Sequence, residues 1–563
     1  MPVLHHADPA NAASSAGAHT LVDTLLDEQR QLTAVEAFAR SHARHEITEP
    51  HYRKLLPVSA PRPGEQYAFE VNLDKCSGCQ ACVTACHSLN GLDEGESWRE
   101  VGALFGEATV PGETGGNRVV PLQQTITTAC HHCVEPGCLE GCPVLAYDKD
   151  PVTGIVRHLD DQCIGCSYCI LKCPYDVPKY SATRGIVRKC DMCHGRLAVG
   201  EAPACVQACP NEAIRISVVD QAGIRSDLGK RRREESLTET RNTGHEALIF
   251  SERLLTSIPA NEWLPDSPSP TITLPTTRYV TKKPVADLRA ADHSLPRPQP
   301  AHWPLILMLV LTQAGIGGLL AARFVGTKSL SLELVSLSLL FAGLTASVFH
   351  LGQPLKAWRV WLGWRTSWLS REAIALNAFA GAAVVSVAAR WLPPLTNYYS
   401  LITFSVAIVA ATAVFAQAMV YADTHRAFWS LRHTAPRFFG SALLLGLALA
   451  LTFQPSAPLA LALLLVKLLK LGCELSVLKH ADTDSDRWTQ LRRTAALQTG
   501  ALRPVLALRL LAALAAGVFL PFAIATGAAS TALAVSAFFL CLLGELAERY
   551  LFFTSVAPDK MPV

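Results

Sequence analysis

The C-terminal half of the chain is dominated by long apolar segments. Eight such segments follow one another beyond Trp303, and most are long enough to cross the hydrocarbon core of a bilayer. They cover residues 304–325, 330–350, 372–391, 400–421, 437–453, 457–478, 503–526 and 530–552. The fifth is short and the sixth contains Lys467 and Lys470, so these two are the weakest of the series. The pattern predicts an all-α domain of eight transmembrane helices over residues 303–563. Buried helices of a large soluble domain are the alternative.

The basic residues between these segments are distributed unevenly. The loops after the second, fourth and sixth segments carry twelve with their flanks: Lys356, Arg359, Arg365, Arg371, Arg426, Arg432, Arg437, Lys479, Arg487, Arg492, Arg493 and Arg503. The loops after the first, third, fifth and seventh segments carry three, which are Arg323, Lys328 and Arg390. Because cytoplasmic loops are enriched in Lys and Arg, we expect an inner-membrane protein with both termini and the N-terminal domain facing the cytoplasm.

The first 302 residues show a different, mostly polar pattern. Apolar residues recur at roughly helical spacing between Thr20 and Ala43, which predicts one or two amphipathic helices in an N-terminal extension of residues 1–65. They pack on their own domain or dock on a partner. The start of the chain shows no apolar targeting segment, so we expect a reducing cytoplasm. Residues 259–302 contain nine prolines and are predicted to be a stiff, extended linker.

Between these flanks, sixteen of the eighteen cysteines form four groups of four. The groups are Cys76, Cys79, Cys82 and Cys86; Cys130, Cys133, Cys138 and Cys142; Cys163, Cys166, Cys169 and Cys173; and Cys190, Cys193, Cys205 and Cys209. Each group opens with C-x-x-C and closes with C-x-x-x-C. Proline follows the last cysteine in three groups, and His87 stands there in the first. The third group reproduces the bacterial ferredoxin run C-x2-C-x2-C-x3-C-P.

This spacing is typical of iron–sulfur clusters. A tight C-x-x-C-x-x-C loop supplies three thiolates, and the fourth comes from elsewhere in the chain. Zinc sites and disulfides are the alternatives, but the third cysteine and the trailing proline have no zinc rationale. We therefore predict an α+β, ferredoxin-like domain over residues 66–258 with four [4Fe-4S] clusters. The net charge of +3 and the lack of a basic stripe indicate no nucleic-acid partner.

These motifs resemble one family in both halves of the chain. CIGCSYCILKCPYDVPKY at residues 163–180 is similar to the electron-transfer subunit of dimethyl-sulfoxide reductase and related complex iron–sulfur molybdoenzymes. SVFHLGQP at 347–354, SWLSRE at 367–372 and GELAERYLFF at 544–553 resemble the eight-span anchor subunit of the same enzymes. The chain therefore resembles a fusion of two subunits, in the dimethyl-sulfoxide reductase and sulfite dehydrogenase group. The first 65 residues have no counterpart in this resemblance.

The resemblance implies an electron relay. A separate molybdopterin-containing subunit carries out the substrate chemistry, the clusters carry electrons singly, and the anchor exchanges two electrons with ubiquinone or menaquinone. It also implies that the first cysteine group pairs with the fourth and the second with the third. Some relatives replace a third-group cysteine and hold a [3Fe-4S] cluster, whereas Cys166 is present here.

His350 is the first candidate for quinone binding. It ends the second apolar segment on the expected cytoplasmic side, and an imidazole can exchange a proton with a quinone oxygen near neutral pH. The family places quinol binding at the histidine of this HLG-x-P motif. Arg371, Glu474, Glu545 and Arg549 are the other ionisable candidates, and helix pairing or snorkelling is their alternative role. No haem is expected, and Cys473 and Cys541 are interpreted as inert packing residues.

Two classes of function follow from these features. The inward orientation favours a subunit of a sulfite:quinone oxidoreductase, which oxidises cytoplasmic sulfite. A reductase of S- or N-oxides, or a formate or polysulfide enzyme, is the alternative within the family. A stand-alone membrane redox sensor or transporter is the alternative outside it, although the segments hold few internal charges and no broken-helix pattern.

Overall fold

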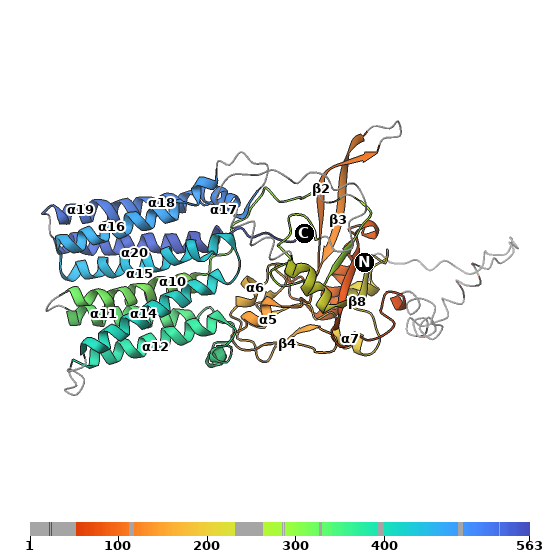
Figure 1. Cartoon of the computed structure of the whole chain (residues 1–563), viewed down its shortest axis with the longest axis horizontal. Coiled ribbons are helices and arrows are strands. Elements are labelled where there is room, and N and C mark those ends of the chain that lie inside the picture. The colour runs from red at the N-terminus through yellow and green to blue at the C-terminus, as the bar shows by residue number, and fades with distance from the viewer. Residues whose placement is uncertain are drawn as a thin grey trace, which may run out of the picture.

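The computed structural model divides the chain into a cluster half, which extends to residue 302, and a membrane half beyond it (Figure 1). It describes residues 22, 24, 27, 36, 52–111, 117–230, 263–283, 285, 288–325, 329–390, 399–481, 488–527 and 530–563. The helices predicted between residues 20 and 43 therefore lie outside the described residues, apart from four isolated helical positions.

Two three-stranded sheets frame the cluster half. The first has the order β8-β1-β9 and the second the order β10-β2-β3. Their strands are β1 (Glu65–Asn72), β8 (Ile214–Asp220), β9 (Arg278–Val280), β2 (Glu100–Pro111), β3 (Asn117–Thr128) and β10 (Arg289–Ala290). Two short hairpins join β4 (Tyr147–Lys149) to β5 (Val156–His158) and β6 (Lys179–Ser181) to β7 (Ile186–Arg188). The predicted α+β class of this region is confirmed.

Short helices carry the cysteine groups between these strands. They are α4 (Ala81–Asn90), α5 (Gly137–Gly141), α6 (Tyr168–Lys172), α7 (His194–Ala198) and α8 (Ala204–Gln207). Buried cysteines from all four groups belong to the apolar cores of this half, where they pack against residues such as Phe69 and Ile126. The thiols are therefore part of the hydrophobic core of this half.

The described part of the predicted linker packs on the cluster half. Strand β9 pairs in parallel with β1, and β10 pairs with β2, so the segment extends both sheets. Thr273 and Thr276 bond to Tyr175 and to the carbonyl of His131, respectively. Strands β9 and β10 are short and lie at sheet edges, and the prolines of the segment fall outside them. These residues are therefore part of the cluster half, whereas the sequence predicted only an extended connection between two domains.

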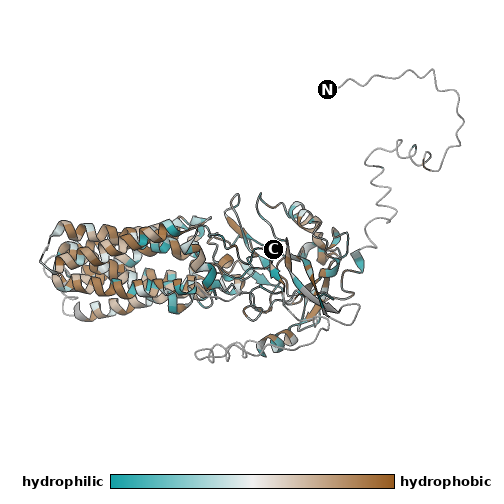
Figure 2. Ribbon diagram, turned by 90° about the horizontal axis from the view of Figure 1, so that it is seen from above, coloured by the Kyte–Doolittle hydropathy of each residue, from teal (hydrophilic) through white to brown (hydrophobic). Residues whose placement is uncertain are grey.

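The membrane half is a bundle of long apolar helices (Figure 2). These are α10 (Trp303–Ala321), α11 (Ser329–Val348), α12 (Trp368–Ala388), α14 (Tyr399–Ala422), α15 (Leu431–Phe453), α16 (Ala457–Leu475), α18 (Arg503–Leu514), α19 (Leu520–Ala525) and α20 (Thr531–Thr554). A π-helical turn, Ala515–Phe519, joins α18 to α19. The short α17 (Gln490–Thr499) precedes them.

Seven helices in the described residues are long and apolar enough to cross a membrane, where the sequence predicted eight spans. Helices α18 and α19 count together as one of the seven, from Arg503 to Ala525. The predicted sixth span is present as the 19-residue α16, which carries Lys467, Lys470 and Glu474 and is not one of the seven. The chain is thus a multi-pass membrane protein with seven candidate spans, and the eighth stays a prediction.

The basic loops lie on the side of the bundle that faces the cluster half. The loop after α11 bonds to the third cysteine group through Gly352 and Gln353. Asp423, which follows α14, pairs with Lys172 of the cluster half at 2.8 Å. The C-terminal Val563 packs against Gly102 of β2. These contacts join the two halves at one end of the bundle.

Candidate iron–sulfur centres and their contact with the membrane half

The four C-x-x-C turns share one backbone conformation. The residue before the second cysteine has a positive φ in every group: +75° at Gly78, +41° at His132, +69° at Gly165 and +58° at Met192. Such a left-handed residue turns the chain tightly, and only glycine adopts it without strain. Backbone N–H groups of two of these turns donate to sulfur, from Gly165 to Cys163 at 3.3 Å and from Met192 to Cys190 at 3.4 Å.

The prolines that follow three of the groups end their helices. Pro143 and Pro174 follow cysteines that cap α5 and α6, and Pro210 follows Cys209 just beyond α8. Helix α4 has His87 at this position and continues to Asn90. Proline lacks the N–H that a continuing helix needs, so this one substitution explains the longer helix of the first group.

The sixteen thiols act on one another electrostatically in four sets. Each set holds three cysteines of one group and the last cysteine of another. Set I is Cys76, Cys79, Cys82 and Cys209; set II is Cys86, Cys190, Cys193 and Cys205; set III is Cys130, Cys133, Cys138 and Cys173; set IV is Cys142, Cys163, Cys166 and Cys169. The first group thus meets the fourth, and the second meets the third.

Burial and neighbouring thiols raise the pKa of many of these cysteines, although a hydrogen bond to His158 lowers that of Cys163. Burial, followed by the thiol of Cys205, raises the pKa of Cys86 to about 12. Burial is also the first cause of the raised pKa of Cys133, although the Thr273 hydroxyl acts against it. A thiolate array of this kind needs bound metal to be stable, because coordination is what deprotonates a buried thiol.

The surroundings of set III fit a bound inorganic group. One cavity is lined by Cys130, Cys133, Cys138 and Cys173 together. No three His, Cys, Asp or Glu side chains in the described part of the chain are spaced to hold a single metal ion. Four thiols around one cavity fit a core in which each metal atom takes one thiolate, as in a cubane cluster. The sixteen cysteines are consistent with four [4Fe-4S] clusters.

Several buried polar atoms near the sets have no hydrogen-bond partner in the described residues. They are Nε and Nη2 of Arg99, both ring nitrogens of His131 and Nε2 of His132. Leaving a buried polar group unsatisfied costs about 1–3 kcal/mol. Their concentration around the thiols is a further indication that anionic groups occupy this space in the native protein.

The membrane half contacts set IV directly. The N–H groups of Gly352 and Gln353 donate to the carbonyls of Gly165 and Ile164, at 3.4 and 3.0 Å. At the start of α12, Ser367 and Ser370 donate to the carbonyls of Gly141 and Pro143. Glycine is required at 352, because a Cβ there would lie 2.0 Å from the Gly185 carbonyl oxygen.

His350 lies two residues before this contact. Its Nδ1 donates to the carbonyl of Ser347, and a carbonyl only accepts, so Nε2 is the unprotonated ring nitrogen. His302, at the start of α10, is close enough to act on it electrostatically. His302 was not among the sequence candidates, and its position directly before Trp303 at the first span was the available signal.

Glu372 was also missed by the sequence analysis. It lies two residues after Ser370, is 4% exposed, and has no hydrogen-bond partner for Oε1 in the described residues. Tyr168 and Tyr421 are the groups that it influences electrostatically. A lone carboxyl inside an apolar segment was the signal for it, within the SWLSRE motif.

The other ionisable candidates have partners of their own. Arg371 is half-buried at the side of α12, where it bonds to the carbonyls of Trp364 and Arg365. Glu474 and Glu545 are paired inside the bundle with Arg509, at 2.7 and 2.9 Å. Arg549 pairs with Glu548 and also donates to Gln313. These contacts favour the helix-pairing role for Glu474, Glu545 and Arg549, and quinone binding by Arg371, Glu545 and Arg549 stays a prediction.

The two cysteines outside the groups differ from each other. Cys541 is fully buried in the bundle, as a packing residue should be. Cys473 is exposed on α16, so the interpretation of Cys473 as a packed residue was wrong.

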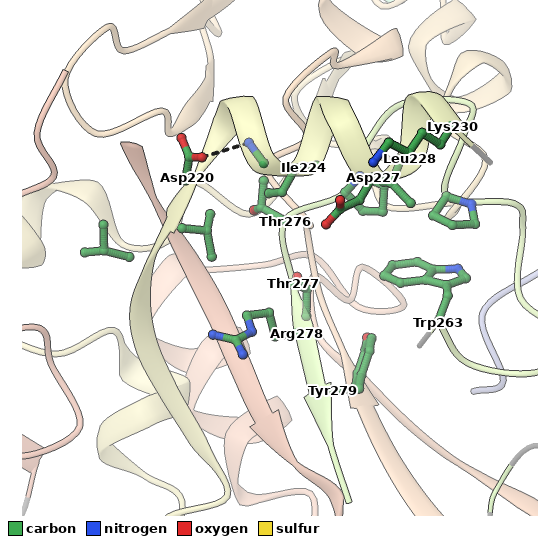
Figure 3. Close-up of a pocket in the computed structure, with 15 residues that line it drawn as sticks. Asp220, Ile224, Asp227, Leu228, Lys230, Trp263, Thr276, Thr277, Arg278 and Tyr279 are labelled. Atoms are coloured by element: carbon green, nitrogen blue, oxygen red, sulfur yellow. Dashed lines mark hydrogen bonds between the residues drawn. The ribbon is translucent and has the colours of Figure 1, made fainter. Parts of the chain in front are cut away.

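A separate pocket lies on the cluster half, between strand β9 and helical residues 221–230 (Figure 3). Asp227, Trp263, Arg278 and Tyr279 are among its lining side chains, and none of the cysteines lines it. The pocket is thus distinct from the thiol sets.

A chain of buried thiol sets docked on a multi-helix membrane bundle defines a membrane-bound electron-transfer protein. Two family descriptions match it: "4Fe-4S dicluster domain" over residues 123–219 and "DMSO reductase anchor subunit (DmsC)" over residues 300–554. The chain belongs to the dimethyl-sulfoxide reductase family, and it unites the electron-transfer and membrane-anchor subunits in one polypeptide.

Individual relatives match the cluster half. A subunit of the anaerobic dimethyl sulfoxide reductase of Haemophilus influenzae is 34% identical over 157 residues, which are 28% of this protein and 76% of the relative. Thiosulfate reductase electron transfer subunit PhsB of Salmonella typhi is 35% identical over 167 residues, or 30% and 83% of the two proteins. Hydrogenase-2 operon protein HybA of Escherichia coli O157:H7 is 40% identical over 156 residues, or 25% and 48%.

Proposed function

We propose that this chain relays electrons between a molybdopterin-containing catalytic subunit and a membrane quinone. The observation that carries the proposal is the continuous order of the thiol sets. Cys82 of set I acts on Cys205 of set II, Cys190 of set II acts on Cys130 of set III, and Tyr147 lies between sets III and IV. Set IV then touches the loop of the membrane half.

Each set is proposed to bind one [4Fe-4S] cluster, whose contribution when bound is to accept and donate single electrons. The thiols of each set supply the four ligands, and the N–H groups of Gly165, Met192 and Ala213 support the sulfurs of Cys163, Cys190 and Cys209. Because Cys79 of set I is exposed, set I is proposed to face the catalytic subunit.

The quinone is proposed to bind where the membrane half meets set IV. His350 and Glu372 each lie two residues from a backbone contact to that set. The Nε2 of His350 can take a proton from a quinol hydroxyl or, when protonated, give one to a quinone oxygen, and the buried Glu372 carboxyl can take or give the second. Both proton-exchanging groups would thus stand beside the cluster that exchanges the electrons, in either direction of the reaction.

The substrate of the catalytic subunit is a separate proposal. The basic loops and the cluster half lie on the same side of the bundle, which supports a cytoplasmic catalytic subunit. We therefore retain sulfite oxidation coupled to quinone reduction. The second candidate is reduction of S- or N-oxides with electrons from quinol, and the names of the dimethyl sulfoxide and thiosulfate reductase relatives support it.

The test is mild detergent purification of the tagged chain, followed by metal analysis and quinone assays. The expected result is a molybdenum-containing partner and about sixteen irons per chain. Sulfite-dependent quinone reduction would support the first substrate, and quinol-dependent reduction of an S-oxide the second. A chain purified alone, with iron but no molybdenum partner, would favour the stand-alone redox protein instead.

A variant series tests the quinone site in the same preparation. His350→Gln and Glu372→Gln should abolish reduction of the clusters by quinol while iron content stays unchanged. Asn377→Ala is the matched control, because Asn377 is an exposed residue on the helix of Glu372 whose side chain donates to the carbonyl of Ala373 in the same helix. Normal quinol reactivity in both site variants would refute this location.

A further inference from the structure

Two buried cations in the cluster half have no carboxylate partner in the described residues. Arg99 is 2% exposed; its Nη1 donates to the hydroxyl of Thr127 at 3.2 Å, and that hydroxyl lies 3.7 Å from Cys82 Sγ. Its Nε and Nη2 have no hydrogen-bond partner among those residues. A buried arginine cannot lose its proton, so its charge must be balanced by an anion nearby.

Lys189 is the second buried cation and is 3% exposed. Its Nζ lies 3.7 Å from Cys130 Sγ and donates to the carbonyl of Cys190 at 2.8 Å. The carbonyl of Val156 accepts a further bond from it. Carbonyl oxygens are neutral, and Asp191, which also acts on Lys189 electrostatically, forms no ion pair with it in the described residues, so the sulfurs are its nearest anionic partners.

The two cations lie at successive junctions of the thiol sets. Arg99 acts on Cys82 of set I and on Cys205 of set II. Lys189 acts on Cys190 of set II and on Cys130 of set III. At the third junction the corresponding residue is neutral, because Tyr147 lies between Cys138 of set III and Cys169 of set IV.

A fixed positive charge stabilises the state of a neighbouring centre that carries more negative charge. Reduction adds one electron to a cluster, so a nearby cation favours the reduced form and raises the midpoint potential. The effect is strong here because both side chains are buried and poorly screened by solvent. Set II lies between both cations and receives the largest effect.

We propose that Arg99 and Lys189 raise the midpoint potentials of the clusters of sets I, II and III, and most of all that of set II. Set IV lies beside neither of them, and its own neighbour His158, which acts on Cys163, is paired with the Asp160 carboxylate at 2.8 Å. The inference rests on the proposed binding of four clusters. According to this inference, the two side chains set a stepwise profile of midpoint potentials along the relay. The clusters of sets I to III hold an electron more readily than the cluster of set IV beside the membrane half.

The alternative to this electrostatic role is a structural one, in which Arg99 and Lys189 only fill space between the thiol sets. A structural role predicts that a neutral side chain of similar size lowers stability but leaves the midpoint potentials of the remaining clusters unchanged. The electrostatic role predicts that the potential falls while the fold is retained, and that it recovers when the charge is restored in a different side chain.

The experiment is a redox titration of the purified complex, monitored by electron paramagnetic resonance, with iron content measured in the same samples. Arg99→Gln and Lys189→Gln should each lower the midpoint potentials of two clusters, and the shared cluster should respond to both. Arg99→Lys and Lys189→Arg should keep the potentials near those of the parent. In every variant one cluster, that of set IV, should not shift and serves as the internal reference.

The double variant Glu96→Gln with Arg188→Gln is the matched control. Arg188 neighbours Lys189 and is buried, but its guanidinium pairs with Glu96 at 3.3 Å. Removing both charges disturbs the same region without changing its net charge. The expected result is a lower unfolding temperature with unchanged midpoint potentials.

The outcomes separate this inference from the proposed function. Fewer than four clusters in the parent protein would overturn the proposed function itself. Four clusters with unchanged potentials in both glutamine variants would overturn only the charge role of Arg99 and Lys189. If Arg99→Gln loses iron, the midpoint potentials of the Thr127→Val variant are measured in its place, because this change releases Arg99 from its position beside Cys82. Unchanged potentials of both clusters next to Arg99 in that variant would equally overturn the role of Arg99.

Discussion

The two halves of the molecule bury charge in different ways. In the membrane half, buried cations meet carboxylates: Arg437 pairs with Glu548 at 3.1 Å, and Lys470 with Glu545 at 2.9 Å. In the cluster half, the buried Arg188 also pairs with Glu96, but the buried Arg99 and Lys189 form no ion pair with a carboxylate in the described residues and lie between thiols. Helices that cross lipid must neutralise charge internally, whereas the cluster half keeps positive charge free for anions that the polypeptide does not itself contain.

Close-packed glycines occur both at the contact between the two halves and inside the bundle. At the contact between them, Gly352 and Gly185 approach so closely that a Cβ on either would overlap backbone atoms. Inside the bundle, Gly317 and Gly446 allow α10 and α15 to pack closely, as small residues do between membrane helices. Close approach joins the two halves at the first place and packs two helices at the second.

The largest predicted effect comes from removing a thiol. Cys173→Ser should cost set III its cluster, so that iron falls by about four atoms per chain. The altered resonance signal should match that of Cys133→Ser and differ from that of Cys166→Ser, although Cys166 belongs to the same sequence group. Metal analysis and electron paramagnetic resonance measure both points.

Cys473→Ser is the control for that experiment, since Cys473 is an exposed residue of α16. It should leave all iron in place. A Cys173→Ser protein whose signal changes like that of Cys166→Ser would show that the sets are paired differently.

Breaking the charge balance of the bundle should have the next largest effect. Glu545→Gln leaves Lys467, Lys470 and Arg509 with one negative charge fewer, and the loss of one partner in a buried pair costs about 3–5 kcal/mol. The thermal unfolding temperature in detergent should fall clearly. Glu94→Gln, at an exposed carboxylate of the cluster half, should stay within about 0.5 kcal/mol of the parent.

The contact between the halves can be disturbed without removing any ligand. Gly352→Ala should push the loop of His350 away from set IV and slow the reduction of the clusters by quinol, while iron content is retained. Gly381→Ala is the matched control, because nothing lies within 4 Å of a Cβ at that helix position. Equal quinol-dependent rates in the two variants would argue against electron entry at this contact.

The smallest effect is expected at the surface of the cluster half. Lys54 pairs with Glu212 at 2.7 Å, but its side chain is 60% exposed. Solvent screens such a pair, so Lys54→Ala should change the free energy of unfolding by less than about 1 kcal/mol. A destabilisation as large as that of Glu545→Gln would mean that this exposed ion pair contributes as much to stability as the buried pairs of the bundle.

Much of the architecture could be predicted from local patterns. The cysteine spacing and the apolar runs each depend on residues close together in the chain, and they led to the α+β region, to the sixteen thiols and to the helices of the bundle. Helix α16 shows the limit of this approach, since Lys467 and Lys470 look unfavourable for a membrane helix until Glu545 of α20 is found beside them.

The sequence by itself determined which residues can bind metal and which segments can enter a membrane, because both properties reside in the side chains. Only the tertiary structure decided that residues 278–280 and 289–290 add edge strands to the two sheets, that Glu372 is buried next to the contact with set IV, and that Arg99 and Lys189 stand between thiol sets. These relations join positions far apart in the chain, and their energy comes from burial and Coulomb interactions that exist only after folding.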